Sequence, residues 1–229
     1  MKLIVFDGNS ILNRAFYGVK PMTNRNGLFT NAVFGFVNII NKHLSADEYD
    51  CAAIAFDMKA PTFRHEMYDG YKATRKGMPP ELAMQLPYAK RFASLFGLKV
   101  IEREGYEADD IIGSLAKKAD AKGMMTVIVT GDRDSFQLIS DNITVTLSST
   151  HEDKLYDVKR IKDEYGVMPL QMIDVKSLMG DSSDNIPGVK GVGEKTALKL
   201  IADYGSLDGV YENIESVKGA LHDKLALGR

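Results

Sequence analysis

The chain of 229 residues contains no tryptophan, a single cysteine and only four histidines. One cysteine, Cys51, excludes an internal disulfide framework and is typical of a reducing compartment. The scattered histidines give none of the spacings of a zinc site. The apolar runs are far shorter than the roughly 20 residues of a membrane span, and the opening stretch MKLIVFDG holds too few apolar residues for a signal peptide. We therefore expect a cytoplasmic protein without a membrane segment.

The bulk composition is that of a globular protein. Apolar residues make up 45% of the chain and charged residues 26%, which are ordinary values. The length allows one large domain or two small ones. The net charge of −2, taken alone, argues against a nucleic-acid partner.

Short apolar runs rich in β-branched residues alternate with helical patterns over the first 150 residues. This alternation predicts an α/β fold with a mostly parallel central sheet flanked by helices. The predicted strands are residues 2–6, 51–56, 98–102, 125–130 and 143–147. The predicted helices of this part are residues 31–44, 89–96 and 108–122. In the last of these, Ala108, Ile111, Ile112, Leu115, Ala116 and Ala119 follow the 3.6-residue period and should face the sheet.

After about residue 155 the strand patterns disappear. Helical patterns cover residues 158–166, 169–179, 193–205 and 206–214. We therefore expect an α/β part over residues 1–165 and a helical part over residues 166–229. The final residues, LHDKLALGR, have a helical pattern that runs to the last residue, so we expect the helical part to be cut short there.

Acidic residues follow the ends of several predicted strands. Asp7, Asp57 and Asp132 each close a strand, and Asp134 lies two residues beyond the last of these. A fourth strand leads into a helix whose opening holds Glu107, Asp109 and Asp110. Glu107 and Asp110 lie on one side of that helix, and Asp109 points about 100° away. Because ligands of open parallel sheets bind beyond the carboxyl ends of the strands, we expect these side chains at one edge.

A glycine-rich segment, MGDSSDNIPGVKGVGEKTALKLI, covers residues 179–201. The spacing of Gly188 and Gly193 is that of a phosphate-binding loop, but such a loop needs a lysine directly after the second glycine. Glu194 stands there instead, and no apolar strand leads into the segment. The pattern therefore does not predict an ATP site. The segment also carries two further acids, Asp181 and Asp184.

For each of these acids taken singly, a role as helix cap or turn former is the better explanation. Together they would repel one another strongly unless a cation neutralised them. Oxygen ligands without Cys or His select a hard ion such as Mg²⁺ or Mn²⁺. The number of carboxylates favours two ions, an arrangement that hydrolyses phosphodiesters. Setting these nine of the 31 acids aside leaves 22 against 29 Lys and Arg, so that the acidic site would lie in a basic surround.

A phosphate-containing substrate gives the glycine-rich segment a second interpretation. Gly191 and Gly193, between apolar residues and a helix, have the form of a helix-hairpin-helix. Amides of such a turn and of the next helix bind DNA backbone phosphates without reading sequence. Lys190 and Lys195 add positive charge. A plain turn between packed helices remains the alternative.

Five stretches together resemble the 5′ nuclease (flap endonuclease) superfamily. They are FDGNSILNRAFYG, AFDMKAPTFRHEMYDGYKATRKGMP, GYEADDIIGSLA, VTGDRDSFQL and GDSSDNIPGVKGVGEKTA. The chain is most similar to the N-terminal 5′→3′ exonuclease domain of bacterial DNA polymerase I, and the resemblance covers essentially its whole length in order. It implies the fold of that superfamily, which is PIN-like.

The resemblance also implies roles for individual residues. One group of metal ligands would be Asp7, Asp57, Glu107, Asp109 and Asp110, and a second would be Asp132, Asp134, Asp181 and Asp184. The segment from about residue 68 to residue 90 would form an arch over the active site. Lys72 and Arg75 of this arch would contact the scissile phosphate. Further DNA contacts would come from Arg14, Tyr17, Lys76, Lys190, Gly191, Gly193, Lys195 and Thr196. Phe16 could stack on an unpaired base like Tyr17, but core packing is at least as good an explanation. The hairpin of this family often also binds K⁺.

We therefore expect a monomeric, Mg²⁺-dependent nuclease that removes 5′ flaps and the 5′ ends of RNA primers in replication and repair. Its partners would be branched or 5′-flap DNA and RNA–DNA hybrids, and the sequence leaves open a covalently linked polymerase region. Two alternatives stand beside this interpretation. One is a ribonuclease of the related PIN-like fold, which would not need the hairpin. The other is a DNA-structure binding module without catalysis, against which the complete set of carboxylates counts.

Overall fold

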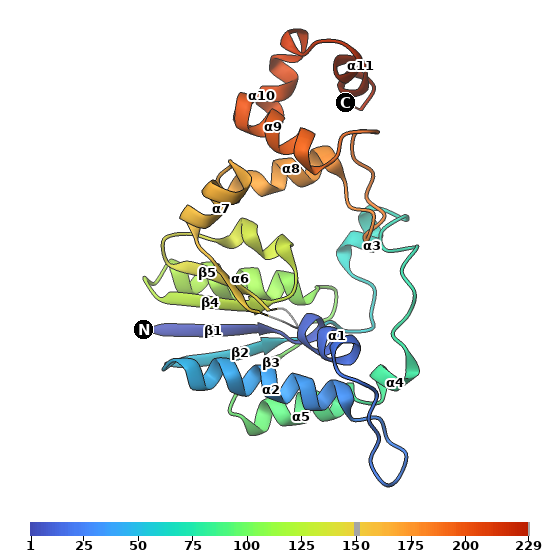
Figure 1. Ribbon diagram of the computed structural model, residues 1–229, viewed down its shortest axis with the longest axis vertical. Helices are drawn as coiled ribbons and strands as arrows, with labels where there is room; N and C mark the ends of the chain where they lie inside the picture. Colours follow the sequence, from blue (N-terminus) through green and yellow to red (C-terminus); the bar gives the residue numbers. More distant parts are fainter. Residues whose placement is uncertain (149–151, 229) are drawn as a thin grey trace. The chain divides into compact units, whose positions relative to one another are not determined.

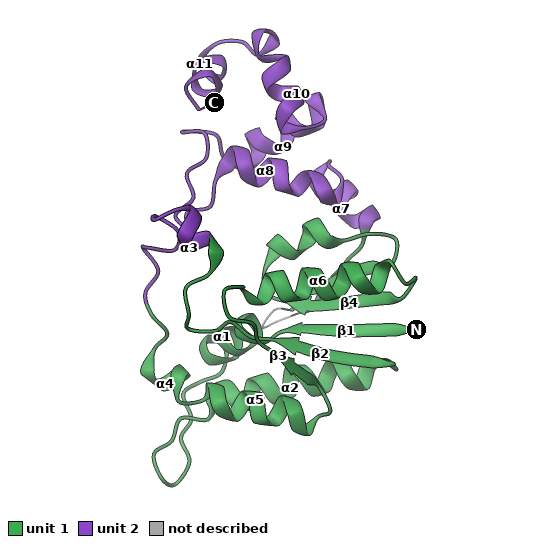
Figure 2. Cartoon of the chain, turned by 180° about the vertical axis from the view of Figure 1, so that it is seen from behind, with its two compact units in different colours: residues 1–63, 77–157 green, residues 64–76, 158–229 purple. Residues whose placement is uncertain are grey.

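The computed structural model describes residues 1–148 and 152–228. The chain divides into two compact units, which Figure 2 colours separately. The α/β unit consists of residues 1–63 and 77–157, and the helical unit of residues 64–76 and 158–229. Residues 64–76, which include part of the expected arch, thus group with the helical unit. Within the described residues, no helix combines the length and apolar character needed to cross a bilayer.

A six-stranded sheet forms the centre of the α/β unit (Figure 1). Its spatial order is β3-β2-β1-β4-β5-β6. The strands are β1 (Lys2–Asp7), β2 (Cys51–Ala55), β3 (Lys99–Ile101), β4 (Met125–Thr130), β5 (Ile143–Leu147) and β6 (Lys154–Tyr156). All neighbouring strands pair in parallel except β6, which runs antiparallel to β5. The mostly parallel sheet predicted from the sequence is confirmed.

Helices cover both faces of the sheet, as parallel strands require. They are α1 (Gly8–Gly18), α2 (Asn31–Ala46), α4 (Pro80–Ala83), α5 (Leu86–Leu95), α6 (Ala108–Asp120) and the 3₁₀ turn η1 (Arg133–Leu138). Figure 1 shows α2 and α5 on one face and α6 on the other. Ile4 and Phe6 of β1 pack with Phe36 of α2 in the main core. On α6, five of the six predicted sheet-facing residues are buried, and Leu115 is half-buried.

All five predicted strands are confirmed, whereas β6, α1, α4 and η1 were not predicted. Strand β6 has only three residues, which is too short for a period to be recognised. Helix α1 begins with Gly8, Asn9 and Ser10, residues with weak helix propensity. The helix forms there because the Asp7 side chain accepts a hydrogen bond from the Ser10 amide and caps its first turn.

The helical unit has a core of its own. Its elements are part of α3 (Phe63–Met67), then α7 (Val158–Tyr165), η2 (Pro169–Gln171), α8 (Met172–Met179), α9 (Glu194–Tyr204), α10 (Leu207–Glu212), η3 (Ile214–Ser216) and α11 (Ala220–Leu227). Leu178 of α8 and Ile201 of α9 are fully buried in this core, together with Val210 of α10. The helical character predicted beyond residue 155 is confirmed. Helices α8 and α9 flank residues 180–193, the part of the glycine-rich segment that lies outside the helices.

Candidate active site

The carboxyl ends of β1, β2 and β4 lie side by side, because these strands are parallel neighbours. Asp7 is the last residue of β1 and is only 5% exposed. Its carboxylate accepts hydrogen bonds from the Ser10 amide at 2.9 Å and from the Thr130 hydroxyl, at the end of β4, at 2.7 Å. Asp7, the most buried of the candidate metal ligands, is therefore fixed by hydrogen bonds from both α1 and β4.

Asp57 connects the end of β2 to the start of α6. Its Oδ1 accepts a hydrogen bond of 2.7 Å from the amide of Ala108, the first residue of α6. Its own amide donates to Asn9 Oδ1 at 2.9 Å. At the same helix start, the Glu107 amide donates to Asp110 Oδ2 at 2.9 Å. Asp110 thus turns back onto its own helix and contributes to its cap.

Asp132 and Asp134 follow β4 in a tight turn. The Asp132 amide donates to Thr130 Oγ1 at 3.0 Å, and Asp132 Oδ1 accepts from the Asp134 amide at 2.9 Å. Thr130 therefore bonds to both Asp7 and Asp132, and it fixes the spacing of the acids that follow two adjacent strands. We infer that the threonine of the VTGD motif is a structural part of this site.

The electrostatics of the α/β unit show that its carboxylates are crowded. Burial raises the pKa of Asp7 to about 6, with a contribution from Asp57 and Asp132 and against the lowering effect of its two hydrogen bonds. Desolvation and then repulsion from four acids raise the pKa of Asp109 to about 8; the acids are Asp7, Asp132, Asp57 and Asp134. The Asp109 side chain keeps an exposed side, so solvent screens part of this repulsion. Asp109 of α6 therefore interacts with acids that follow the ends of β1, β2 and β4.

This donor set fits hard divalent cations, because it offers oxygen ligands and an excess of negative charge that a cation would relieve. Within residues 1–148 and 152–228, however, no group of three or more His, Cys, Asp or Glu has the geometry of a ready-made metal site. Several of the acids instead bond to neighbouring amides and hydroxyls. We therefore expect metal binding to require changes of rotamer at these side chains.

Arg14 and Tyr17 come from α1, directly after Asp7. Arg14 Nη2 donates to the carbonyl of Gly131 at 3.3 Å, and its Nε, although buried, has no hydrogen-bond partner. Tyr17 is 73% exposed and meets Phe16 edge to face. Phe16 also packs against the main core, so Tyr17 is the better placed of the two to stack on a base.

The acids of the helical unit lie in a short loop, which we call the acidic loop (residues 181–186). Paired hydrogen bonds between Asp181 and Ile186 close the loop, at 2.9 and 2.8 Å. Gly180 and Gly188 lie back to back just outside it: a Cβ on either one would collide with backbone atoms of the other. Gly180 also adopts φ +72°, which favours glycine. The glycines flanking these acids are therefore required by a close approach of the backbone to itself.

We predict that Gly188→Ala destabilises the protein by about 1–3 kcal/mol, the range typical of overpacking, because the atoms it would meet are backbone atoms of Leu178, Met179 and Gly180. Thermal unfolding measures this effect. Gly77→Ala is the control, since its Cβ would meet nothing within 4 Å and Gly77 lies outside the helices. Equal melting temperatures for the two variants would contradict the close packing of this loop.

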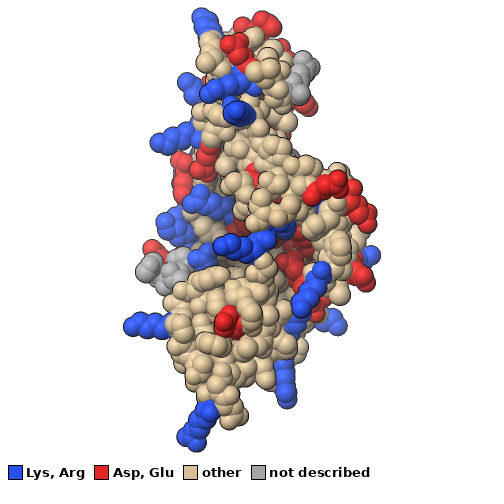
Figure 3. All heavy atoms as spheres, turned by 90° about the vertical axis from the view of Figure 1, so that its right-hand side faces the viewer, with Lys and Arg blue, Asp and Glu red and all other residues tan. Residues whose placement is uncertain are grey.

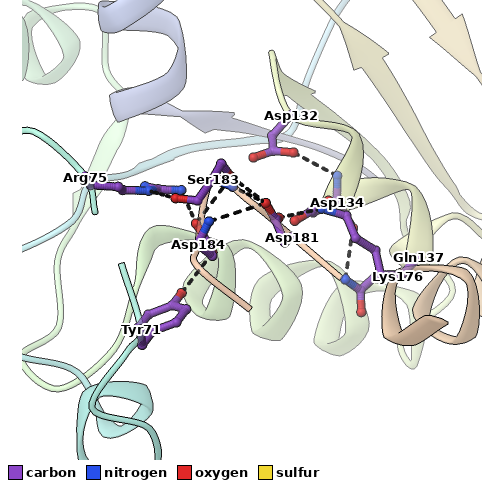
Figure 4. Close-up of polar contacts among 9 residues, drawn as sticks. All are labelled: Tyr71, Arg75, Asp132, Asp134, Gln137, Lys176, Asp181, Ser183 and Asp184. Atoms are coloured by element: carbon purple, nitrogen blue, oxygen red, sulfur yellow. Dashed lines mark hydrogen bonds and ion pairs between the residues drawn. The ribbon is translucent and has the colours of Figure 1, made fainter. Parts of the chain in front are cut away.

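Both acids of the acidic loop have cationic partners within the helical unit (Figure 4). Asp181 forms an ion pair of 2.6 Å with Lys176 of α8. Partial burial alone would raise the pKa of Asp181. The Lys176 ammonium and hydrogen bonds from Ser183 outweigh this effect and hold the pKa of Asp181 well below its usual range. Asp184 pairs with Arg75 and accepts a hydrogen bond of 3.2 Å from the Tyr71 hydroxyl. Each acid is thus already neutralised by a neighbouring cation.

Residues 68–76, which we call the basic segment, carry Lys72, Arg75 and Lys76. The Lys72 ammonium lies 4.9 Å from the centre of the Tyr71 ring. The Lys72 amide donates to the Asp184 carbonyl at 2.8 Å. Arg75 and Lys76 are exposed. The structure therefore brings two of the three predicted phosphate-binding cations next to the acidic loop.

The predicted hairpin lies between the acidic loop and α9. Gly191 adopts φ +79°, and the Val192 amide donates to the Val189 carbonyl at 2.9 Å, so that a tight turn leads into α9. Lys190, Gly193 and Lys195 are exposed, and Thr196 is half-buried. The Gly191 carbonyl accepts a hydrogen bond of 3.3 Å from Lys224 of α11. The turn thus offers exposed lysines and the start of a helix, while one of its carbonyls already has an ammonium partner.

Charge on the molecular surface is mixed. On the face drawn in Figure 3, Lys and Arg side chains project among groups of Asp and Glu. This arrangement explains how a chain of net charge −2 can still offer cations to a polyanion.

Sequence reasoning missed the residues that support the acids. Asn9 Oδ1 accepts a hydrogen bond from the Asp57 amide, and the Thr130 hydroxyl donates to Asp7. The Ser10 amide also donates to Asp7, while Ser10 Oγ accepts from the Gly131 amide. The position of Asn9 and Ser10 directly after Asp7, and of Thr130 two residues before Asp132, was the available signal. Tyr71 and Asn185 contact partners more than 100 residues away in the sequence, and no local pattern indicates such pairs.

Two protein families cover almost the whole chain. Residues 2–166 match the 5′-3′ exonuclease N-terminal resolvase-like domain, and residues 167–229 match the 5′-3′ exonuclease C-terminal SAM fold. The DNA polymerase I of Caldicellulosiruptor bescii is 47% identical over the full chain, and that of Bacillus subtilis is 43% identical over 98% of it. The chain spans only about a quarter of these relatives, 27% and 26% of their respective lengths.

Solved structures agree on the fold. The 5′-exonuclease of T5, solved with zinc, superimposes with a TM-score of 0.78 at 21% identity, covering 99% of this chain and 84% of the other. Flap endonuclease-1 from Methanococcus jannaschii gives a TM-score of 0.58 at 20% identity, covering 98% of this chain and 76% of the other. With both of its domains matched in order, the chain belongs to the 5′–3′ exonuclease family and consists of a resolvase-like α/β unit followed by a SAM-like helical unit.

Proposed function

We propose that the protein is a divalent-metal-dependent 5′→3′ exonuclease and flap endonuclease. It hydrolyses DNA phosphodiesters at 5′ flaps and removes the 5′ ends of RNA primers during replication and repair in the cytoplasm. The observation that carries this proposal is the crowding of carboxylates at the carboxyl edge of the parallel sheet. Relatives named DNA polymerase I and a family defined by 5′–3′ exonuclease activity support it.

The acids of the α/β unit hold the metal in this proposal. The residues are Asp7, Asp57, Glu107, Asp109, Asp110, Asp132 and Asp134. Burial, and then repulsion from neighbouring acids, raises the pKa of Asp7 and of Asp109. This supports the proposal, because a bound cation would stabilise the charged form of both carboxylates. We propose the same role, metal ligand, for Asp181 and Asp184 of the helical unit. Two Mg²⁺ or Mn²⁺ ions, when bound, would activate water and stabilise the leaving oxygen.

The cations of the basic segment bind the scissile phosphate in this proposal. Lys72 and Arg75 supply positive charge where negative charge develops during cleavage. Lys76 and Arg14 bind neighbouring phosphates, and Tyr17 stacks on an unpaired base. The exposure of Tyr17 and of Lys76 supports these assignments. K⁺ binding at the hairpin and a monomeric state remain predictions.

The hairpin grips duplex DNA through Lys190, Gly191, Gly193, Lys195 and Thr196. We predict that the double variant Lys190→Ala/Lys195→Ala binds duplex DNA more weakly, by a similar factor for every sequence. Because two phosphate contacts are lost, the slope of log K against log salt concentration should fall by about 2. Filter binding at several salt concentrations measures this slope. An unchanged slope would show that the two lysines do not contact phosphates.

The proposed function is tested with a 5′-labelled flap duplex in Mg²⁺. The protein should cut near the flap junction, and a chelator should abolish the cut. Asp132→Ala should bind the flap but leave it uncut, whereas Asp141→Ala, an exposed acid outside the site, should cut normally. A flap that is bound and remains uncut at every Mg²⁺ and Mn²⁺ concentration would overturn the proposal and favour a binding module. Cleavage restricted to RNA would favour the ribonuclease alternative.

A further inference from the structure

Two of the hydrogen bonds between the basic segment and the acidic loop involve no charged side chain. Asn185 Nδ2 donates to the Gly70 carbonyl at 2.7 Å. The Lys72 amide donates to the Asp184 carbonyl at 2.8 Å. The two segments are separated by more than 100 residues in sequence and lie in the same unit. These bonds therefore form a tertiary contact between the predicted phosphate-binding cations and two predicted metal ligands.

Both sides of this contact adopt an unusual backbone conformation. Lys72 has φ +53° and Asn185 has φ +57°, and in the described part of the chain no other non-glycine residue has a positive φ. Asparagine tolerates this region better than most residues, whereas lysine does not favour it. Such conformations persist where surrounding contacts demand them, and they gather at functional sites. Each of the two strained residues here takes part in one of the two bonds.

The same segments are also joined through the Asp184 carboxylate. Arg75 pairs with Oδ1 and the Tyr71 hydroxyl donates to Oδ2 (Figure 4). Arg75 Nε additionally donates to the Ser183 carbonyl at 3.0 Å. A divalent cation bound by Asp184 would compete with Arg75 for the same carboxylate. The charged contacts are therefore the ones that metal binding weakens.

The Asn185–Gly70 bond differs from them because it joins two neutral groups. It does not depend on whether Asp184 binds Arg75 or a cation. We propose that Asn185 is a positioning residue, which holds the basic segment on the acidic loop while Arg75 exchanges Asp184 for the substrate phosphate. This inference rests on the proposed function, since it takes Lys72 and Arg75 as the groups that bind phosphate.

Two variants remove the amide donor in different ways. Asn185→Gly keeps the positive φ without strain, and Asn185→Asp keeps the size of the side chain but cannot donate. Asn213→Ala is the control, because Asn213 Nδ2 also donates to a backbone carbonyl, that of Gly209 at 2.8 Å, but this bond is local and joins no distant segments. If both Asn185 variants show the same defect and the control does not, the missing N–H group is the cause of the defect.

The first readout is limited trypsin digestion in Mg²⁺ without DNA, followed by mass spectrometry of cuts after Lys72, Arg75 and Lys76. Both Asn185 variants should be cut there about 3- to 10-fold faster than the wild type, as the loss of one hydrogen bond implies. The control should be cut at the wild-type rate. Wild-type rates for both Asn185 variants, or a faster rate in only one of them, would overturn the proposal.

The second readout is cleavage of the 5′-flap duplex. Both Asn185 variants should show kcat reduced about 3- to 10-fold with little change in KM, because the segment that stabilises the transition state is displaced while the rest of the DNA surface is intact. A change confined to KM would overturn a positioning role. Digestion without DNA requires no cleavage activity. A wild type that fails to cut the flap would therefore overturn the proposed function. The trypsin result would still show whether Asn185 holds the basic segment on the acidic loop.

Discussion

Asp7→Asn should abolish flap cleavage and at the same time stabilise the metal-free protein. The activity falls because a metal ligand is removed, and metal ions contribute several kcal/mol to transition-state stabilisation, equivalent to about 10³-fold or more in rate. The stability rises because Asp7 is buried and its pKa is raised to about 6. Asparagine can still accept the hydrogen bond from the Ser10 amide.

The sign of the pH dependence follows from this raised pKa. In the unfolded chain Asp7 titrates near 3.8, whereas in the folded protein it titrates at about 6. The folded state therefore holds the proton longer, and stability falls as pH rises between these two values. The shift of about two units corresponds to about 3 kcal/mol. Asp109, with a pKa of about 8, should extend the loss of stability toward pH 8.

Chemical denaturation of metal-free protein at pH 4 and pH 8 measures this effect. Asp7→Asn should match the wild type at pH 4 and exceed it by about 1–3 kcal/mol at pH 8. Asp141→Asn, an exposed acid, serves as the control and should show no such gain. Saturating Mg²⁺ should stabilise the wild type more than Asp7→Asn. If Asp7→Asn were less stable than the wild type at pH 8, the ionised Asp7 side chain would not destabilise the metal-free fold, contrary to this prediction.

Lys72→Ala should reduce the single-turnover rate of flap cleavage by about 10²- to 10³-fold, the effect of removing one donor that stabilises developing charge. The affinity for flap DNA should change far less, because most of the binding energy comes from other phosphate contacts. Quench-flow kinetics and equilibrium binding separate the two effects. Lys122→Ala, at an exposed position after α6, controls for the loss of one surface charge.

Arg75→Ala should have a second consequence that Lys72→Ala lacks. Arg75 is the ion-pair partner of Asp184, so its removal leaves that carboxylate without its guanidinium. We expect Arg75→Ala to raise the affinity of the helical unit's acids for a divalent cation while it lowers the cleavage rate. Equal metal affinity in Arg75→Ala and in the wild type would show that the ion pair does not compete with metal.

The sheet-edge acids could be predicted from the sequence because they follow from local rules. Apolar runs define the strands, parallel strands end at one edge, and the acids come directly after the runs. Asp7, Asp57 and Asp132 were found in this way without knowledge of any contact. A capping role was one of the explanations given for Asp110, and repulsion among the acids was expected. Helical periodicity could not decide between a cap and a ligand, since it fixes the direction of a side chain but not its rotamer.

The contacts of the basic segment could not be predicted, for a different physical reason. Gly70 and Asn185 are 115 residues apart, and nothing in either motif specifies the other. The grouping of residues 64–76 with the helical unit likewise depends on tertiary contacts. The resemblance to a nuclease family indicated which residues matter in this segment, whereas only the structure identifies what holds them.

Metal binding is the most direct test of the central claim that the sheet-edge acids form a divalent-cation site. Mn²⁺ can be titrated into the DNA-free protein and the bound fraction followed by electron paramagnetic resonance, for the wild type and for Asp109→Asn. We predict saturable binding of two ions per chain, with at least one lost or strongly weakened in Asp109→Asn and none affected in Asp141→Asn. Absence of saturable binding at millimolar Mn²⁺, or binding indifferent to Asp109, would contradict the account.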